Sequence, residues 1–181
     1  MVKRILIAAI VILVGGAGAL SYWQLKTYSG TRSTHEVVLS APAGRVWEHL
    51  TDNVKRSDWV NGLITVLPLS GTPGQKDARS LLVMLSEGRR FEVEEKIIDT
   101  EPGVWLGLKT TSLAAILTTT FTLEQLGPAD APTAKIRLTF QQDTQHLTWQ
   151  GKLLAPFLRM AAETTAQRDL ERLKQIVERA D

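Results

Sequence analysis

The feature that most constrains this chain is a succession of short alternating segments over residues 63–142, followed by one long helical pattern over residues 151–179. One stretch shows the alternation clearly, because Phe91, Val93 and Ile97 are interleaved with charged side chains, and the alternation is expected to break near Ile98. A two-residue period is typical of a strand with one buried face. The links between the segments are too short for crossover connections, so the sequence predicts an antiparallel meander followed by a long helix.

Two short helices are predicted between the first strand and the meander, within residues 40–62. Ser40 is expected to cap the first one, because its hydroxyl can accept a hydrogen bond from a free amide of the first turn. Pro42 fits that turn because it lacks an amide that would be unpaired there. The strands are expected at residues 35–39, 63–69, 78–85, 91–97, 104–110, 116–126 and 133–142.

The C-terminal helical pattern carries one apolar stripe, which includes Phe157, Met160 and Leu170. A single stripe predicts that this face of the helix packs against the sheet. Pro156 lies inside the pattern and removes a backbone donor there. We expect it either to kink the helix or to mark its first turn, with residues 151–155 as a lead-in.

The N-terminal sequence predicts that the protein is anchored in a membrane. Residues 5–23 form a run of 19 residues without a charge, and as a helix they would span roughly 28 Å, close to the hydrocarbon thickness of a bilayer. Lys3 and Arg4 precede the run and favour a cytoplasmic N-terminus, with the rest of the chain outside the cytoplasm. We therefore expect a single-pass transmembrane anchor in residues 1–23 and a tether in residues 24–33.

The alternative for the N-terminus is a cleaved signal peptide. The N-terminal segment has a basic start, an apolar core and small residues at positions 17–19 that suit a signal peptidase. Cleavage there would give a secreted or periplasmic protein. In either case residues 34–181 are expected to form the one folded domain.

Charge and cysteine content exclude several classes of function. The formal charge is +2, from 21 basic and 19 acidic residues, and Lys3, Arg4 and Lys26 lie before Tyr28. Leaving those three out gives 18 basic against 19 acidic residues, or −1, with no basic stripe, so nucleic acid is not an expected partner. The chain has no cysteine, which excludes disulfides and thiolate chemistry. Oligomeric state is left open.

The order of elements, together with several local motifs, resembles the START-like superfamily, in particular its SRPBCC or polyketide cyclase/dehydrase-like branch. The motifs are residues 38–42, Val46-Trp47, residues 50–52, Trp59, Gly103, residues 151–156 and residues 170–174. The resemblance implies an α+β helix-grip fold. In that fold a curved antiparallel sheet of about six or seven strands wraps around the long C-terminal helix, and two short helices follow the first strand. Members of the superfamily include lipid carriers, cyclases and coenzyme Q binding proteins, so the fold alone does not define a function.

A helix-grip fold can enclose a cavity between sheet and helix, and apolar side chains on the inward faces would line it. The same residues would fill an ordinary core if there were no cavity, and both alternatives remain open for them. The predicted ligand-binding set is Trp59, Phe91, Val93, Leu106, Leu108, Phe121, Phe140, Phe157 and Met160.

Glu95 is the one candidate catalytic residue. Strand alternation places it on the buried face between Val93 and Ile97, where burial would raise the pKa of the carboxyl and suit general acid–base chemistry. A bulge or a register error of one residue would instead turn it to water. Glu95 is a weak candidate for that reason, and we expect a binding protein more than an enzyme.

No metal and no cofactor are expected. The pairs His49/Asp52 and Asp143/His146 have a spacing compatible with metal ligation, but neither has a third ligand nearby in the sequence. Histidines that are exposed or locally hydrogen-bonded are the simpler interpretation.

The link at residues 112–117 is unusually apolar for a connection between strands. It is interpreted as a lid or a lipid-contacting loop, or as a buried strand end.

Three functional hypotheses follow. The first is a membrane-tethered, non-enzymatic domain that binds a small apolar ligand, such as a lipid or a quinone-like molecule. The second is a cyclase/dehydratase-type enzyme that uses a buried carboxylate. The third is a structural or interaction module with a filled interior and no ligand.

Overall fold

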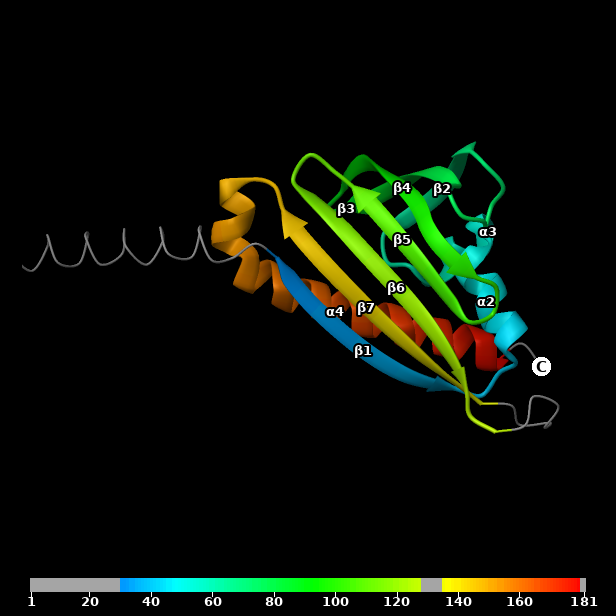
Figure 1. Ribbon diagram of the computed structural model, residues 1–181. Helices are drawn as coiled ribbons and strands as arrows, with labels where there is room; N and C mark the ends of the chain where they lie inside the picture. Colours follow the sequence, from blue (N-terminus) through cyan, green and yellow to red (C-terminus); the bar gives the residue numbers. More distant parts are fainter. Residues whose placement is uncertain (1–29, 128–134, 180–181) are drawn as a thin grey trace, which may run out of the picture.

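The computed structural model describes residues 30–127 and 135–179 (Figure 1). Seven strands form one sheet in the order β1-β7-β6-β5-β4-β3-β2, and all neighbouring pairs are antiparallel. The strands are β1 (Thr31–Leu39), β2 (Leu63–Ser70), β3 (Arg79–Ser86), β4 (Arg89–Glu101), β5 (Trp105–Thr111), β6 (Ala115–Gln125) and β7 (Ile136–His146). The helices are α2 (Ala43–Thr51), α3 (Asn53–Trp59) and α4 (Trp149–Arg179).

The predicted antiparallel meander and long C-terminal helix are confirmed. Strands β2 to β7 follow one another along the chain and across the sheet, and β1 closes the series beside β7. The sheet curves around α4, while α2 and α3 lie near the C-terminal end of that helix (Figure 1). This arrangement is the helix-grip architecture that the resemblance implies.

Strand β4 shows how local alternation determines which side chains enter the interior. Glu95 is 5% exposed, whereas Phe91 and Glu92 are exposed near the start of the strand. The register of β4 against β5 shifts between Ile97 and Asp99, which marks a β-bulge. The break in alternation expected near Ile98 is this bulge, and it lies beyond Glu95, so the predicted burial of Glu95 is correct.

The predicted role of Ser40 as a helix cap is wrong. Helix α2 starts at Ala43 with Pro42 in the cap position, and no described side chain caps it. The backbone N–H of Ser40 donates instead to Oε1 of Glu178 at 2.8 Å, which ties the end of β1 to α4. The cap that does form belongs to α3, where Asp52 accepts hydrogen bonds from the amides of residues 54 and 55.

Helix α4 starts at Trp149, so residues 151–155 are helical and not a lead-in. Pro156 lies inside the helix, and Figure 1 shows the first turns of α4 at an angle to the rest. The second half of α4 packs into the core through Leu170, Leu173 and Val177. Its first half stands largely free of the strands, so the apolar stripe there is exposed.

The predicted transmembrane anchor in residues 1–23 lies outside the described residues, as does most of the predicted tether. Strand β1 already begins at Thr31, inside the last part of that tether. Within residues 30–127 and 135–179, no helix combines the length and the apolar composition needed to cross a membrane.

Candidate functional site

A cavity of about 730 Å³ lies between the concave face of the sheet and α4. That volume is within the range of small-molecule sites, roughly 300–1,000 Å³. Its walls are mostly apolar and come from α3, α4 and strands β3 to β7. Six of the predicted ligand-binding residues line it, namely Trp59, Phe91, Val93, Leu108, Phe121 and Phe140.

Three residues of the predicted set lie elsewhere. Leu106 is 1% exposed and lines a much smaller neighbouring cavity. Phe157 and Met160 are 69% and 64% exposed and do not line the large cavity, so their predicted inward placement is wrong. The reason is that the first half of α4 lies beside the mouth of the cavity, where no strand covers its apolar stripe.

One wall of the cavity is aromatic. The rings of Trp59 and Phe121 meet edge to face with centroids 6.2 Å apart, and Phe121 lies 5.4 Å from Phe140. The indole Nε1 of Trp59 donates to the backbone oxygen of His49 at 2.9 Å, which fixes the ring against α2. Such edge-on aromatic contacts orient the rings, so this wall is preformed.

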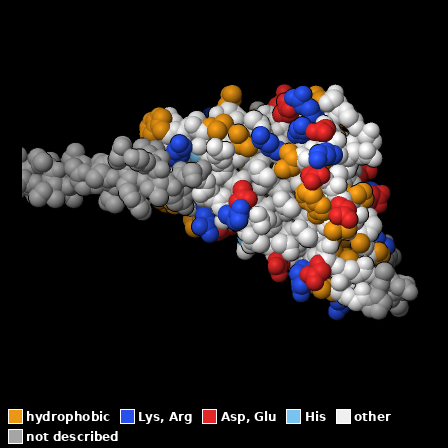
Figure 2. All heavy atoms as spheres, viewed as in Figure 1, with side chains coloured by type: hydrophobic (Ala, Val, Ile, Leu, Met, Phe, Trp, Pro, Cys, Tyr) orange, Lys and Arg blue, Asp and Glu red, His pale blue; other side chains and the backbone are white. Residues whose placement is uncertain are grey.

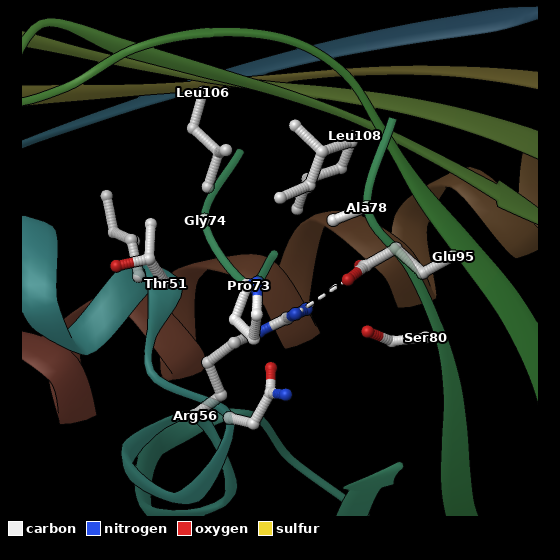
Figure 3. A pocket seen from close by; sticks show the side chains of 12 residues that line it. Thr51, Arg56, Pro73, Gly74, Ala78, Ser80, Glu95, Leu106 and Leu108 are labelled. Carbon is white, nitrogen blue, oxygen red and sulfur yellow. Dashed lines mark hydrogen bonds and ion pairs between the residues drawn. The ribbon is translucent and has the colours of Figure 1, made fainter. Parts of the chain in front are cut away.

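Arg56 of α3 and Glu95 of β4 form a buried ion pair at the inner end of the cavity (Figure 3). Nη1 donates to Oε1 at 2.6 Å and Nη2 donates to Oε2 at 2.9 Å, so the contact is bidentate. The two residues are 8% and 5% exposed. Burial alone would lower the pKa of Arg56, but the charge and hydrogen bonds of Glu95 outweigh it and raise that pKa.

The ion pair separates the large cavity from the smaller one, which holds about 20 Å³ beside Pro73, Gly74 and Ser80. Arg56 and Glu95 line both spaces, and Figure 3 shows the pair among the residues that line the smaller one. A volume of that size has room for about one water molecule. The pair therefore presents polar edges both to the large cavity and to this small one.

The partnership of Arg56 with Glu95 was missed in the sequence. A signal was present, because Arg56 precedes Trp59 by three positions and so shares its helical face. An inward-facing tryptophan implies that the arginine beside it points inward too. A buried arginine then needs a carboxylate partner, and Glu95 was the one carboxylate predicted to be buried.

Further polar groups enter the cavity from β6, β7 and α4. The amide Nε2 of Gln142 donates to Oγ1 of Thr119 at 3.2 Å, and both residues line the cavity. Asp169 also lines it and accepts a hydrogen bond from the backbone N–H of Asn61 at 3.0 Å. Burial raises the pKa of Asp169 to about 6. The cavity thus combines a large apolar volume with a few fixed hydrogen-bonding groups.

The histidines do not converge on a site. Nδ1 of His49 lies 2.9 Å from the backbone oxygen of Arg45, which is the expected local bond. His146 differs from the prediction, because it is 7% exposed and its Nε2 has no partner among the described residues. Burial lowers the pKa of His146. Asp143 is bound to Arg32 at 2.6 Å.

No group of three metal-ligating side chains is found within the part of the chain that the structure describes. The two histidine–aspartate pairs singled out by their spacing are used otherwise: Asp52 caps α3, and Asp143 pairs with Arg32. The absence of a metal or a cofactor stays a prediction.

Comparison with known proteins agrees with this architecture. The structure is similar to that of Zhui aromatase/cyclase from Streptomyces sp. R1128, with a TM-score of 0.67, 17% identity, and coverage of 83% of this chain and 94% of that one. It is also similar to a START superfamily protein from Mycobacterium smegmatis, with a TM-score of 0.67, 13% identity, and coverage of 83% and 99%. At these identities the likeness concerns the fold alone.

No curated protein sequence matches the chain. Residues 30–178 match the family described as polyketide cyclase / dehydrase and lipid transport, which covers nearly all of the described residues. The predicted resemblance to the START-like, SRPBCC branch is confirmed by this match and by the structural neighbours. The chain therefore belongs to the polyketide cyclase / dehydrase and lipid transport family.

Proposed function

We propose that this protein is a membrane-tethered binding domain that holds a small hydrophobic molecule between its sheet and α4. The observation that carries the proposal is the cavity of about 730 Å³ with mostly apolar walls. An interior filled by side chains, as in a purely structural module, does not fit a cavity of this volume. Membership of a family that includes lipid transport supports the same function.

The polar groups of the cavity define the kind of ligand. Arg56 and Glu95 neutralise each other, so their end of the cavity favours an uncharged group that exchanges hydrogen bonds over a charged head group. Gln142 and Thr119 add an amide and a hydroxyl along the same space. A lipid or quinone-like molecule with one carbonyl or hydroxyl group has this combination of properties.

The membrane address rests on the sequence of residues 5–23. Their length without a charge suits one crossing, and Lys3 and Arg4 favour a cytoplasmic N-terminus. The binding domain then lies outside the cytoplasm on a short tether. Mass determination of the mature membrane-bound chain distinguishes this arrangement from a cleaved signal peptide, which would remove about the first 19 residues.

The test of the binding function uses the full chain purified in a mild detergent. A fluorescent fatty alcohol, which carries no charge, serves as the probe, and an organic extract of the purified protein is analysed by mass spectrometry. We expect saturable probe binding and a co-purifying hydrophobic compound that displaces the probe. Absence of both saturable binding and an extracted compound would contradict the proposal.

A second candidate function is a cyclase/dehydratase-type enzyme. The observation that favours it is that Glu95 is buried, lines the cavity and lies beside another polar group, Arg56. Against it, Glu95 is held in a bidentate ion pair, so uptake of a substrate proton would leave the charge of Arg56 buried without its counter-ion. Turnover of the extracted compound that disappears in Glu95→Gln, with probe binding intact, would establish the enzyme. If the unsubstituted protein and Glu95→Gln both bind the compound and neither converts it, only the binding function is supported.

A further inference from the structure

Large apolar side chains are exposed around one end of the molecule. Leu113, in the turn between β5 and β6, is 98% exposed. Four others come from the first turns of α4 and are also exposed: Trp149, Leu154, Phe157 and Met160. We call these five residues the apolar rim. Most exposed apolar residues in proteins are scattered singly, so a concentration of this kind marks an interaction surface.

The members of the rim lie at one end of the molecule although they are distant in sequence. Ala115, at the start of β6, pairs with His146 at the end of β7, which brings the Leu113 turn beside the point where α4 begins. Figure 1 shows that turn and the first turns of α4 at the same end of the sheet. Figure 2 shows hydrophobic side chains over both.

The mouth of the cavity lies within the rim. Leu113 lines the cavity, together with Ser112 and Ala114 of the same turn. On the other side Ala162 and Thr165 line it, immediately after the exposed apolar turns of α4. Anything that covers the rim therefore also covers the entrance to the proposed binding cavity.

The chain enters the fold at this same end. A Cβ on Gly30 would lie 2.8 Å from the backbone oxygen of Thr144, so the first described residue packs against the last part of β7. Only six residues, 24–29, separate it from the uncharged run at residues 5–23. Six residues reach at most about 20 Å when fully extended. A bilayer that holds residues 5–23 is thus within about 20 Å of the end of the fold that carries the rim.

We propose that the apolar rim is a docking surface for the lipid bilayer, with the mouth of the cavity facing the membrane. This inference rests on the proposed membrane address. The bilayer is favoured over a second copy of the chain because the tether brings the rim to the membrane surface at any protein concentration. Charged side chains near the rim are of both signs, with Arg89 and Arg90 beside Glu87 and Glu92, so docking depends on apolar contact more than on anionic lipids.

The functional consequence is a route for the ligand. A hydrophobic molecule that leaves the bilayer beneath the rim enters the cavity without crossing water, and one that leaves the cavity returns to the bilayer in the same way. Of the apolar stretch at residues 112–117, the last three residues form the half-buried start of β6. The turn at residues 112–114 is the part that then contacts lipid, which is one of the two roles expected from the composition of the stretch.

The test uses the full chain, reconstituted in phosphatidylcholine vesicles. Because the chain has no cysteine, single substitutions Leu113→Cys and Phe157→Cys carry an environment-sensitive fluorophore at the rim. Val54→Cys is the matched control, since Val54 is 77% exposed but lies in α3 at the other end of the molecule. We expect both rim labels to shift to the blue and to lose most of their emission to lipids with a nitroxide on the acyl chain. The Val54 label should keep the emission of a label in water.

Two outcomes would overturn the docking proposal. Rim labels that behave like the Val54 label would show that the rim stays in water. A blue shift without quenching by the nitroxide lipids would show that protein, such as a second copy, covers the rim instead.

Fatty-alcohol probe binding, measured in detergent for the unsubstituted and unlabelled protein, tests the cavity independently of the rim, because Leu113 itself lines the cavity. Probe binding without lipid quenching means that the docking proposal fails and the binding function stands. Lipid quenching without probe binding means that the docking proposal stands and the binding function fails.

Discussion

Arg56 and Glu95 connect α3 to β4 through a bidentate ion pair that is almost fully removed from solvent. Moving two charges out of water costs free energy, and such a pair often stabilises the fold no more than apolar side chains of the same size would. Its place at the inner end of an apolar cavity gives it a different use. It fixes two polar edges where the buried end of a ligand would lie.

Substitution of one partner of this pair should destabilise the fold strongly. Arg56→Met leaves the Glu95 carboxylate buried without its counter-ion, and we expect a loss of about 3 kcal/mol in the free energy of unfolding at pH 8. Urea denaturation of the full chain in detergent measures it. A loss below about 1 kcal/mol would indicate that water already reaches and solvates Glu95.

The double variant Arg56→Met/Glu95→Met separates stability from recognition. With both charges removed, most of the lost stability should return, because neither group is left unpaired. Affinity for a fatty alcohol probe should nevertheless stay reduced relative to the unsubstituted protein. Full recovery of both properties would assign the pair a role in folding only.

Asp169 should make stability depend on pH. Burial raises its pKa from 3.8 to about 6 in the folded protein, so the folded state binds the proton more tightly than the unfolded state does. The free energy of unfolding therefore falls as the pH rises from about 4 through 6, where Asp169 loses its proton. Above that range the loss of stability is complete. Because Asp169 is only half-buried, we expect a penalty of about 1 kcal/mol.

Asp169→Asn removes the ionisation and keeps an oxygen for the Asn61 amide. Thermal unfolding of both proteins from pH 4 to pH 8 provides the measurement. The variant should gain stability relative to the unsubstituted protein as the pH rises. A difference between the two that is constant with pH would contradict the raised pKa.

Trp59 should contribute more to stability than its size alone suggests. Trp59→Phe removes the indole donor and leaves the His49 backbone oxygen without that bond. The expected cost is about 1–2 kcal/mol in the free energy of unfolding, measured with urea. Trp149→Phe is the control, because Trp149 is 61% exposed, and it should change stability by less than about 0.5 kcal/mol. Equal effects of the two substitutions would show that the hydrogen bond has no net value.

The sequence predicted the parts of the fold that depend on local periodicity. Alternation placed Glu95 inside and located the break near Ile98, and short turns forced the antiparallel order. Caps were less predictable. Helix α2 begins after Pro42 without a side-chain cap, and the backbone N–H of Ser40 donates to Glu178, whereas Asp52 caps α3.

The cavity itself was the least predictable part. Apolar residues look the same in a sequence whether they fill a core or surround a space, and only the separation of α4 from the sheet distinguishes the two. The stripe on α4 illustrates this, because Leu170 packs into the core while Phe157 of the same stripe is exposed. Periodicity reports the face of a helix, but not the point along its length where its partner ends.

The proposed function depends most on a hollow interior that binds an apolar molecule. The direct measurement is a titration of the full chain in detergent with a fluorescent fatty alcohol, comparing Ala166→Phe with Ala161→Phe. Ala166 lines the cavity, whereas its neighbour Ala161 is exposed on the same helix and does not. We predict that Ala166→Phe weakens binding about tenfold or more, equivalent to about 1.4 kcal/mol, and that Ala161→Phe leaves it unchanged. Equal affinities for the two variants would contradict binding in this cavity.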